Sequence, residues 1–160
     1  MRDFVVAALV IRLASSEDAD AVRRLSDAAV VKLRAVYVHD PQSPMPAVRG
    51  AFERIVAEIG GVVVGTVRVQ REENRLHLIG LFVHPDYQRR GVARGMIEEC
   101  TIRARAAGLG RVSLYTIRQT GNVGVFERLG FGVVSEEAAR GVVSVTGVEL
   151  TDVYMELQLR

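Results

Sequence analysis

The 160-residue chain is 49% hydrophobic and 25% charged, which suits one globular domain over residues 1–160 with a sizeable core. Its formal charge of +2 and the absence of any run of five like charges argue against a nucleic-acid-binding protein. Cys100 is the only cysteine, which excludes an internal disulfide and a multi-cysteine metal site, so no metal is predicted. Its helical spacing favours a core position over a reactive thiol.

The first apolar run extends from Phe4 to Ile11 and is only eight residues long. It follows Asp3 and ends at Arg12, so we interpret it as a buried strand and neither a signal sequence nor a membrane span. With no membrane span, no targeting signal and no disulfide, we expect a cytoplasmic protein without a membrane partner.

The first half of the chain predicts one helix and four strands. Val10 to Leu13 is a strand, and Ser15 is the N-cap of a helix with acidic residues in its first turn. The apolar stripe of this helix comprises Val22, Leu25, Ala29, Leu33 and Val36. Three of the four prolines lie between Tyr37 and Pro46, which predicts a loop and a candidate acceptor-site wall. An antiparallel meander follows, with turns at Gly60-Gly61 and residues 71–74, formed by Arg54 to Ile59, Val62 to Gln70 and Arg75 to Val83.

The second half predicts a strand–helix–strand unit, and hence a right-handed parallel crossover. Its helix ends near Ala107, before Gly108. The later elements are the strand Arg111 to Ile117, a short helix from Asn122 to Leu129, strands at Phe131 to Val134 and Asp152 to Leu157, and an extra hairpin arm from Gly141 to Val148. The predicted fold class is a mixed α/β sheet of the α+β type, with helices on both faces.

The segment from Gln88 to Ala93 joins an apolar strand to an amphipathic helix. Such a turn presents unpaired backbone N–H groups at the positive end of the helix dipole. Gly91 has no Cβ to keep a phosphate away from the main chain, and three arginines surround it: Arg89, Arg90 and Arg94. The pattern predicts a diphosphate site, whereas the alternative is a plain strand-to-helix turn with solvated arginines.

The order strand, Gln-x-x-Gly-x-Ala, helix resembles the acetyl-CoA signature of the GNAT superfamily of N-acetyltransferases. The lead-in Leu81 to Tyr87 is also similar to that family, as are the segments Val10 to Ala19 and Phe126 to Phe131. The resemblance implies a GNAT-like acyl-CoA N-acyltransferase fold. It further implies direct transfer of an acetyl group from acetyl-CoA, as cosubstrate, to an amine in a ternary complex, without a covalent enzyme intermediate.

The resemblance also assigns the cofactor contacts. It implies that the strands Arg75 to Val83 and Arg111 to Ile117 separate at their C-terminal ends, with a bulge at Gly80. The backbone N–H of Leu81 would stabilise the oxyanion. The residues implied in cofactor binding are Leu81, Phe82 and Val83 for pantetheine, Arg89, Arg90, Gly91, Val92, Ala93 and Arg94 for the pyrophosphate, and Gln119 and Phe126 at positions matching the family's asparagine and tyrosine.

Acetyl transfer requires a neutral amine, so a group must accept a proton. His77 stands where the resemblance places a base, and its imidazole is suited to that task; the alternative is a structural histidine. Phe126 departs from the family because phenylalanine cannot protonate the leaving thiolate. The acid role then passes to water, to another residue or to none, and Tyr115 is either a substitute acid or a core residue.

Two functions remain open at this stage: an N-acetyltransferase, and a catalytically weak acyl-CoA-binding or sensing domain. The amine acceptor is a small molecule, a peptide or a protein, and acyl groups other than acetyl remain open. A homodimer through the C-terminal strands is consistent with the resemblance. Scattered acids offer either an entrance for a cation or a solvated surface, namely Glu53, Glu58, Glu72, Glu73, Glu149 and Asp152.

Overall fold

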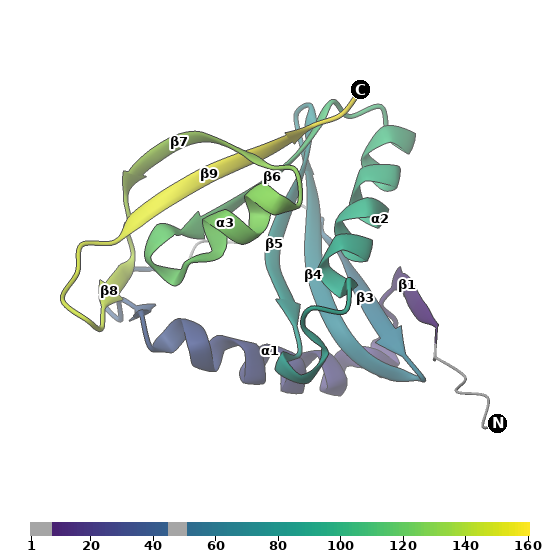
Figure 1. The fold of residues 1–160 in the computed structure, drawn as a ribbon, viewed down its shortest axis with the longest axis horizontal. Coiled ribbons are helices and arrows are strands. Elements are labelled where there is room, and N and C mark those ends of the chain that lie inside the picture. The colour runs from purple at the N-terminus through teal and green to yellow at the C-terminus, as the bar shows by residue number, and fades with distance from the viewer. Residues whose placement is uncertain (1–7, 45–50) are drawn as a thin grey trace.

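The computed structural model describes residues 8–44 and 51–160, which form a seven-stranded sheet, a separate two-stranded sheet and three α-helices (Figure 1). The strands are β1 (Leu9–Leu13), β2 (Tyr37–His39), β3 (Glu53–Ile59), β4 (Val62–Glu72), β5 (Arg75–Val83), β6 (Arg111–Ile117), β7 (Gly132–Ala138), β8 (Val142–Ser144) and β9 (Thr151–Gln158). The helices are α1 (Ala19–Arg34), α2 (Val92–Ala106) and α3 (Asn122–Arg128), with short 3-10 turns at Ser16–Asp18, Pro85–Tyr87 and Arg118–Thr120.

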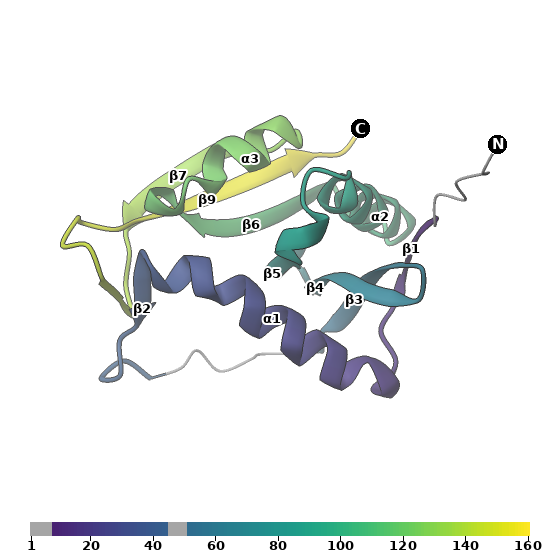
Figure 2. The same cartoon turned by 60° about the horizontal axis from the view of Figure 1, so that its bottom comes forward.

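The large sheet has the strand order β1-β3-β4-β5-β6-β9-β7. Strands β3, β4 and β5 form the predicted antiparallel meander, and β5 and β6 form the predicted parallel pair. In Figure 2, α1 lies on one side of the sheet, whereas α2 and α3 lie on the other. The predicted fold class and its helices on both faces are therefore confirmed.

Strands β5 and β6 pair over only three positions. Their register ends at His77 and Ser113, and beyond that point the strands separate. The register of β4 and β5 shifts between Thr66 and Arg68, opposite Gly80, whose φ is +65°. The bulge predicted at Gly80 is thus present, and it bends β5 away from β6 where a cavity opens.

The core lies mainly between the sheet and α2. Buried side chains of α2, among them Met96, Cys100 and Ala104, share one cluster with Leu76 and Leu78 of β5. Burial raises the pKa of the Cys100 thiol to about 12, so the thiolate is not formed at neutral pH. The predicted core position of Cys100 is confirmed.

The predicted N-cap at Ser15 is part of a buried polar contact. Its backbone N–H donates to the Asp18 carboxylate over 2.7 Å, and Arg12 donates two hydrogen bonds to that carboxylate, of 2.7 and 2.9 Å. These donors hold the pKa of Asp18 well below its usual range. The contact joins the end of β1 to the start of α1.

The prediction of a buried N-terminal strand is wrong for the part of it that the structure describes. Strand β1 starts at Leu9 and pairs with β3 alone, at the edge of the sheet. Leu9, Val10 and Leu13 are exposed at this edge, where β3 is the only described strand beside β1. Residues 1–7 lie outside the described part of the chain.

Two predicted connections differ from the structure. Residues 37–39 form strand β2, not a loop, and β2 pairs with β8. Within the predicted hairpin arm from Gly141 to Val148, only β8 forms a strand, and its partner is β2, which is distant in the sequence. Pro41 and Pro44 follow β2, so they do not interrupt its hydrogen bonds. Pro46 lies outside the described residues.

Strand β7 is longer than predicted because it pairs with β9 along its length, as far as Ala138 opposite Thr151. Within residues 8–44 and 51–160, no helix is both long and apolar enough to cross a membrane.

Candidate functional site

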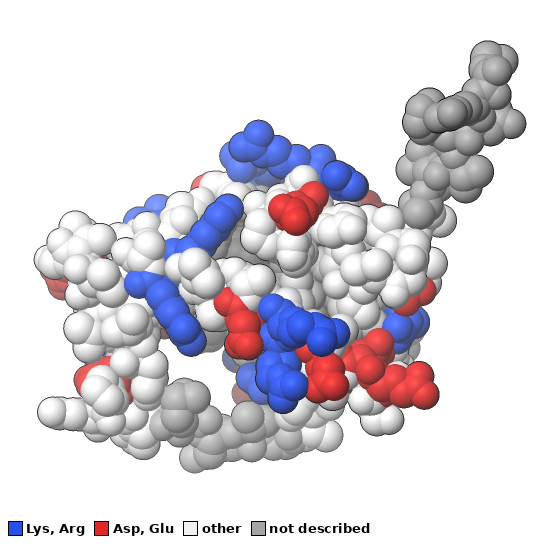
Figure 3. Space-filling view, turned by 90° about the horizontal axis from the view of Figure 1, so that it is seen from below, with Lys and Arg blue, Asp and Glu red and all other residues white. Residues whose placement is uncertain are grey.

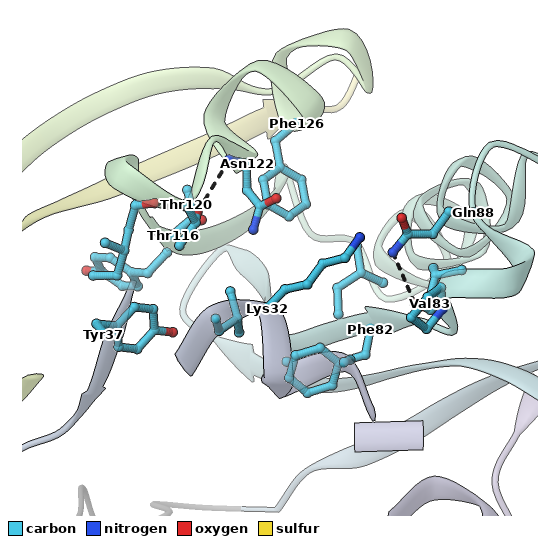
Figure 4. A pocket seen from close by; sticks show the side chains of 16 residues that line it. Lys32, Tyr37, Phe82, Val83, Gln88, Thr116, Thr120, Asn122 and Phe126 are labelled. Atoms are coloured by element: carbon cyan, nitrogen blue, oxygen red, sulfur yellow. Dashed lines mark hydrogen bonds between the residues drawn. The ribbon is translucent and has the colours of Figure 1, made fainter. Parts of the chain in front are cut away.

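Two cavities adjoin where β5 and β6 separate. The larger, of about 540 Å³, is bounded by the end of β5, the segment 87–94 and α3, and we call it the loop cavity. The smaller, of about 320 Å³, lies between α1, β2, β5 and β6, and we call it the α1 cavity (Figure 4). Both share a wall formed by Leu81, Val83, Gln88, Asn122 and Phe126.

Gly91 forms the N-cap of α2 in a left-handed conformation, with a φ of +79°. A Cβ placed on it would meet nothing within 4 Å, so the backbone faces open space. Arg89 has a φ of +63°, which is uncommon outside glycine, so two residues of this loop adopt the left-handed conformation. The first turn of α2 carries no acidic side chain. This arrangement leaves positive backbone N–H groups available to an anion and fits a diphosphate.

Most of the predicted pyrophosphate residues line the loop cavity: Arg89, Gly91, Val92, Ala93 and Arg94. Arg90 does not. Its guanidinium carbon lies 5.1 Å from the centre of the Tyr87 ring, in a cation–π contact. Arg94 also donates to the Arg128 carbonyl over 3.4 Å, which holds the start of α2 close to α3.

The predicted pantetheine strand borders both cavities. Leu81 and Val83 lie in the shared wall, and Phe82 lines the α1 cavity. The Gln88 amide donates to the Val83 carbonyl over 3.4 Å (Figure 4). Gln88, the first residue of the Gln-x-x-Gly-x-Ala motif, is therefore hydrogen-bonded to the end of β5.

Gln119 lines neither cavity. Its carbonyl accepts the Thr151 backbone N–H over 2.8 Å, and its amide donates to the Thr151 hydroxyl over 3.4 Å. Asn122, at the start of α3, brings an amide to the shared wall instead. The sequence analysis did not single out Asn122, although a polar residue directly after Gly121 at a helix start was a usable signal.

His77 lies behind the cavities and not in their walls. Its Nδ1 is 2.8 Å from the Ser113 hydroxyl, and its ring meets the Tyr115 ring edge-on at 5.5 Å between centres. The side chain is buried, and this burial lowers the pKa of the imidazole. His77 is therefore neutral at pH 7 and faces the α1 cavity only through Tyr115.

Tyr115 lines the α1 cavity and is 54% exposed, so the interpretation of Tyr115 as a core residue is wrong. It stands beyond the last paired position of β5 and β6, where separation of the strands uncovers its ring. Partial burial raises the pKa of its hydroxyl. Tyr115 is accordingly a neutral O–H donor at pH 7.

Phe126 lies in the wall shared by the two cavities, as Figure 4 shows. Its ring packs edge-on against Phe131, with 5.9 Å between ring centres. The position predicted from the family's tyrosine thus borders the cavity, and its side chain carries no proton to donate.

The acids considered as an entrance for a cation do not line the α1 cavity. Glu58 and Glu72 pair with arginines. Asp152, on β9, does affect the cavity wall, because its charge contributes to raising the pKa of Tyr37. Lys32, which the sequence analysis did not single out, is the only charged side chain in that wall among the described residues.

On the face seen in Figure 3, basic and acidic side chains are interspersed and form no continuous basic patch. Among the described residues, no group of three or more His, Cys, Asp and Glu side chains is arranged to hold a metal ion.

The model of the acetyltransferase (GNAT) family matches residues 22–131. Three solved structures illustrate the likeness. The ribosomal-protein-S18-alanine N-acetyltransferase from Escherichia coli is 17% identical, with a TM-score of 0.71 and coverage of 94% of each chain. YncA from Salmonella typhimurium, solved with its cofactor acetyl-CoA, is 21% identical, with a TM-score of 0.72 and coverage of 96% of this chain and 95% of that one.

The third structure, the PaiA N-acetyltransferase from Thermoplasma acidophilum in complex with coenzyme A, is 16% identical. Its TM-score is 0.72, and the match covers 95% of this chain and 99% of that one. At such identities the structures show a shared fold.

Proposed function

This chain belongs to the acetyltransferase (GNAT) family, and from that premise we propose that it moves the acetyl group of acetyl-CoA directly to an amine held in the α1 cavity. Its enzyme class is that of an acetyl-CoA-dependent N-acyltransferase. The observation that carries the proposal is the shared wall between the loop cavity and the α1 cavity. An anion at Gly91 and an amine beside Tyr115 would approach this wall from its two sides.

The binding step uses groups of this chain that fit CoA. The N–H groups around Gly91, with Arg89 and Arg94, are assigned the two phosphates of CoA. The backbone edge of Leu81 to Val83, which β6 leaves unpaired, is assigned the amides of the pantetheine arm. Phe126 packs against that arm from α3.

The chemical step is an attack by a neutral amine on the carbonyl carbon of the thioester. A C–N bond forms, the C–S bond breaks and the sulfur leaves with the electron pair. We assign to the Leu81 N–H the stabilisation of the charge that develops on the carbonyl oxygen. The amine nitrogen gives up one proton, which a base of the protein or water must accept.

We propose that His77 accepts that proton. Because His77 does not border the cavity, the proton would reach it through Tyr115 or a water. Burial lowers the pKa of His77 below its ordinary 6.5, so kcat should fall with falling pH only below about 6.5, as the imidazole becomes protonated. His77→Gln is expected to lower kcat about tenfold to a hundredfold and to remove that acidic limb.

The measurement is a pH profile of kcat at saturating substrates. The control is His39→Gln, which changes a histidine that is exposed on β2 and should leave the profile unchanged. An acidic limb that persists in His77→Gln would show that another group accepts the proton.

Phe126→Tyr is expected to increase kcat by up to about tenfold, because it would add a hydroxyl able to protonate the departing thiolate at the shared wall. Steady-state kinetics of thiol release measure this gain. Phe52→Tyr, which adds a hydroxyl to an exposed ring that lines neither cavity, is the control and should leave kcat unchanged. An unchanged kcat in Phe126→Tyr would mean that thiolate protonation does not limit the rate.

The function itself is tested by following thiol release from acetyl-CoA with a panel of amino acids, arylalkylamines, diamines and peptides, together with the mass of each acceptor. Acceptor-dependent release and a product heavier by one acetyl group are expected. The absence of a proton donor at Phe126 favours a second candidate, an acyl-CoA-binding domain with little turnover. Calorimetric binding of acetyl-CoA without turnover of any amine would favour that candidate.

A further inference from the structure

We propose that the acceptor is an amine that also carries a carboxylate, as an amino acid does, and that Lys32 binds this carboxylate. The inference rests on the proposed function and specifies its substrate class. It starts from the charge of the α1 cavity, whose wall contains one cation and no carboxylate among the described residues.

Lys32 is directed into the α1 cavity. Figure 4 shows its side chain extending from α1 across the cavity, with the amino group toward the side where Val83, Gln88 and Phe126 lie. Ala29 and Leu33 of the same helix line the cavity beside it. The ammonium group therefore lies in the space that an acceptor would occupy.

No carboxylate of the described residues forms an ion pair with Lys32, whereas several arginines elsewhere on the surface are paired. The paired arginines are Arg12, Arg23, Arg75, Arg103, Arg111 and Arg118. The positive charge of Lys32 is thus available for an anion brought by the acceptor.

A general stabilising role at the end of a helix does not explain this placement. Lys32 and Arg34 both lie in the last turn of α1, where a cation interacts favourably with the helix dipole. Only Lys32 lines the cavity. Arg34 is exposed and lines neither cavity, so it serves as a control for the effect of the dipole.

The rest of the wall provides donors for a carboxylate. Tyr37 on β2 lines the cavity on the side away from the Lys32 amino group, and Thr116 and Thr120 add hydroxyl groups (Figure 4). Burial, with a contribution from the charge of Asp152, raises the pKa of Tyr37, so its hydroxyl remains a donor at neutral pH. A carboxylate bound by Lys32 would lie in the same cavity as these hydroxyl donors.

A diamine or polyamine fits this wall poorly. Its second ammonium group would meet Lys32 without a carboxylate partner in the wall. Asp152, whose carboxylate lies on β9, and Glu137 on β7 are the acids that act on the tyrosines of the wall, and neither lines the cavity. The cavity therefore favours acceptors whose second charged group is negative.

The test compares acceptors that differ only in the carboxylate: phenylalanine with phenethylamine, and methionine with 3-(methylthio)propylamine, with putrescine as the diamine. We expect kcat/KM of the wild type to be higher for the acid of each pair. Lys32→Met should lower kcat/KM for the acids by about tenfold to thirtyfold and change it for the carboxylate-free amines by less than about threefold.

Three further variants sharpen the result. Lys32→Arg should retain the preference for the acids, and Lys32→Glu should reverse it in favour of putrescine. Arg34→Met should behave as the wild type. Because each preference is a ratio within one variant, differences in folding or in cofactor affinity cancel.

An equal loss for both members of a pair in Lys32→Met would overturn the inference and leave the proposed function standing. Turnover of putrescine above the acids by the wild type would do the same.

Mass spectrometry after incubation with acetyl-CoA supplies one more criterion. Acetylation of Lys32 itself would identify Lys32 as an acetyl acceptor and would contradict its role in binding a carboxylate. If acetyl-CoA binds and no amine of either kind is acetylated, the proposed function fails together with the inference.

Discussion

Gly91→Glu is expected to weaken acetyl-CoA binding by at least about a hundredfold, which corresponds to about 2.8 kcal/mol. The new carboxylate would stand at the N-cap of α2, where the first turn of the helix lines the loop cavity. It would occupy and neutralise the anion site and repel the phosphates. The fold should survive, because the added side chain meets no atom within 4 Å of its Cβ and a negative charge at a helix N-terminus is favourable.

Titration calorimetry with acetyl-CoA measures this effect, with thermal unfolding as the check on folding. Gly61→Glu is a close control: Gly61 has a φ of +80°, against +79° for Gly91, and open space at its Cβ, yet it lies in the β3–β4 turn. The control carries the same backbone strain, of about 1 kcal/mol, and should bind acetyl-CoA normally. If both variants bind as the wild type does, the loop is not the diphosphate site.

Gly65→Val should destabilise the protein by about 3 kcal/mol, because it forces a side chain between β4 and α2. Even a Cβ at Gly65 would lie 2.8 Å from the Met96 sulfur, 3.1 Å from a Val92 methyl group and 3.3 Å from the Ala57 Cβ. All three neighbours are buried in the core, so none of them has room to withdraw.

The expected consequence is a fall in the midpoint of thermal unfolding of about 6–12 °C. Weaker acetyl-CoA binding should accompany it, because Val92 begins the helix whose first turn lines the loop cavity. The control is Gly95→Ala. A Cβ there would meet only the side-chain ends of Ile11 and Leu9 on the edge strand, which can move, and alanine favours the helix. A midpoint for Gly65→Val equal to that of the wild type would contradict this account.

Local patterns sufficed for much of the fold. The meander, the parallel crossover and α2 were predicted because turn residues and hydrophobic periodicity act over a few positions. The prediction of strands failed where the hydrogen-bonding partner of a strand is distant in the sequence. Strand β2 forms only because β8, about a hundred residues later, supplies its hydrogen bonds, and β1 is the edge strand because, among the described strands, only β3 pairs with it.

The features of the candidate site likewise fall into those that local sequence predicts and those that depend on tertiary packing. The loop around Gly91 was predicted because its geometry depends on adjacent residues, whereas the positions of Gln119, Asn122 and Arg90 relative to the cavities depend on how α3 and the loop pack. His77 was singled out as an imidazole on the cofactor strand. Its distance from the cavity wall is set by the register with β6 and by the bulge at Gly80.

By itself, the sequence determined the order of most strands and helices, the turn proposed to bind phosphate and the resemblance to the acetyltransferase family, since each of these depends on residues that are close together in the chain. Only the tertiary structure decided which side chains face the α1 cavity. Lys32 and Tyr37 reach the α1 cavity through the packing of α1 against the sheet and the pairing of β2 with β8. The physical reason is that a cavity wall collects residues that are far apart in the chain, and their meeting depends on packing that no local pattern specifies.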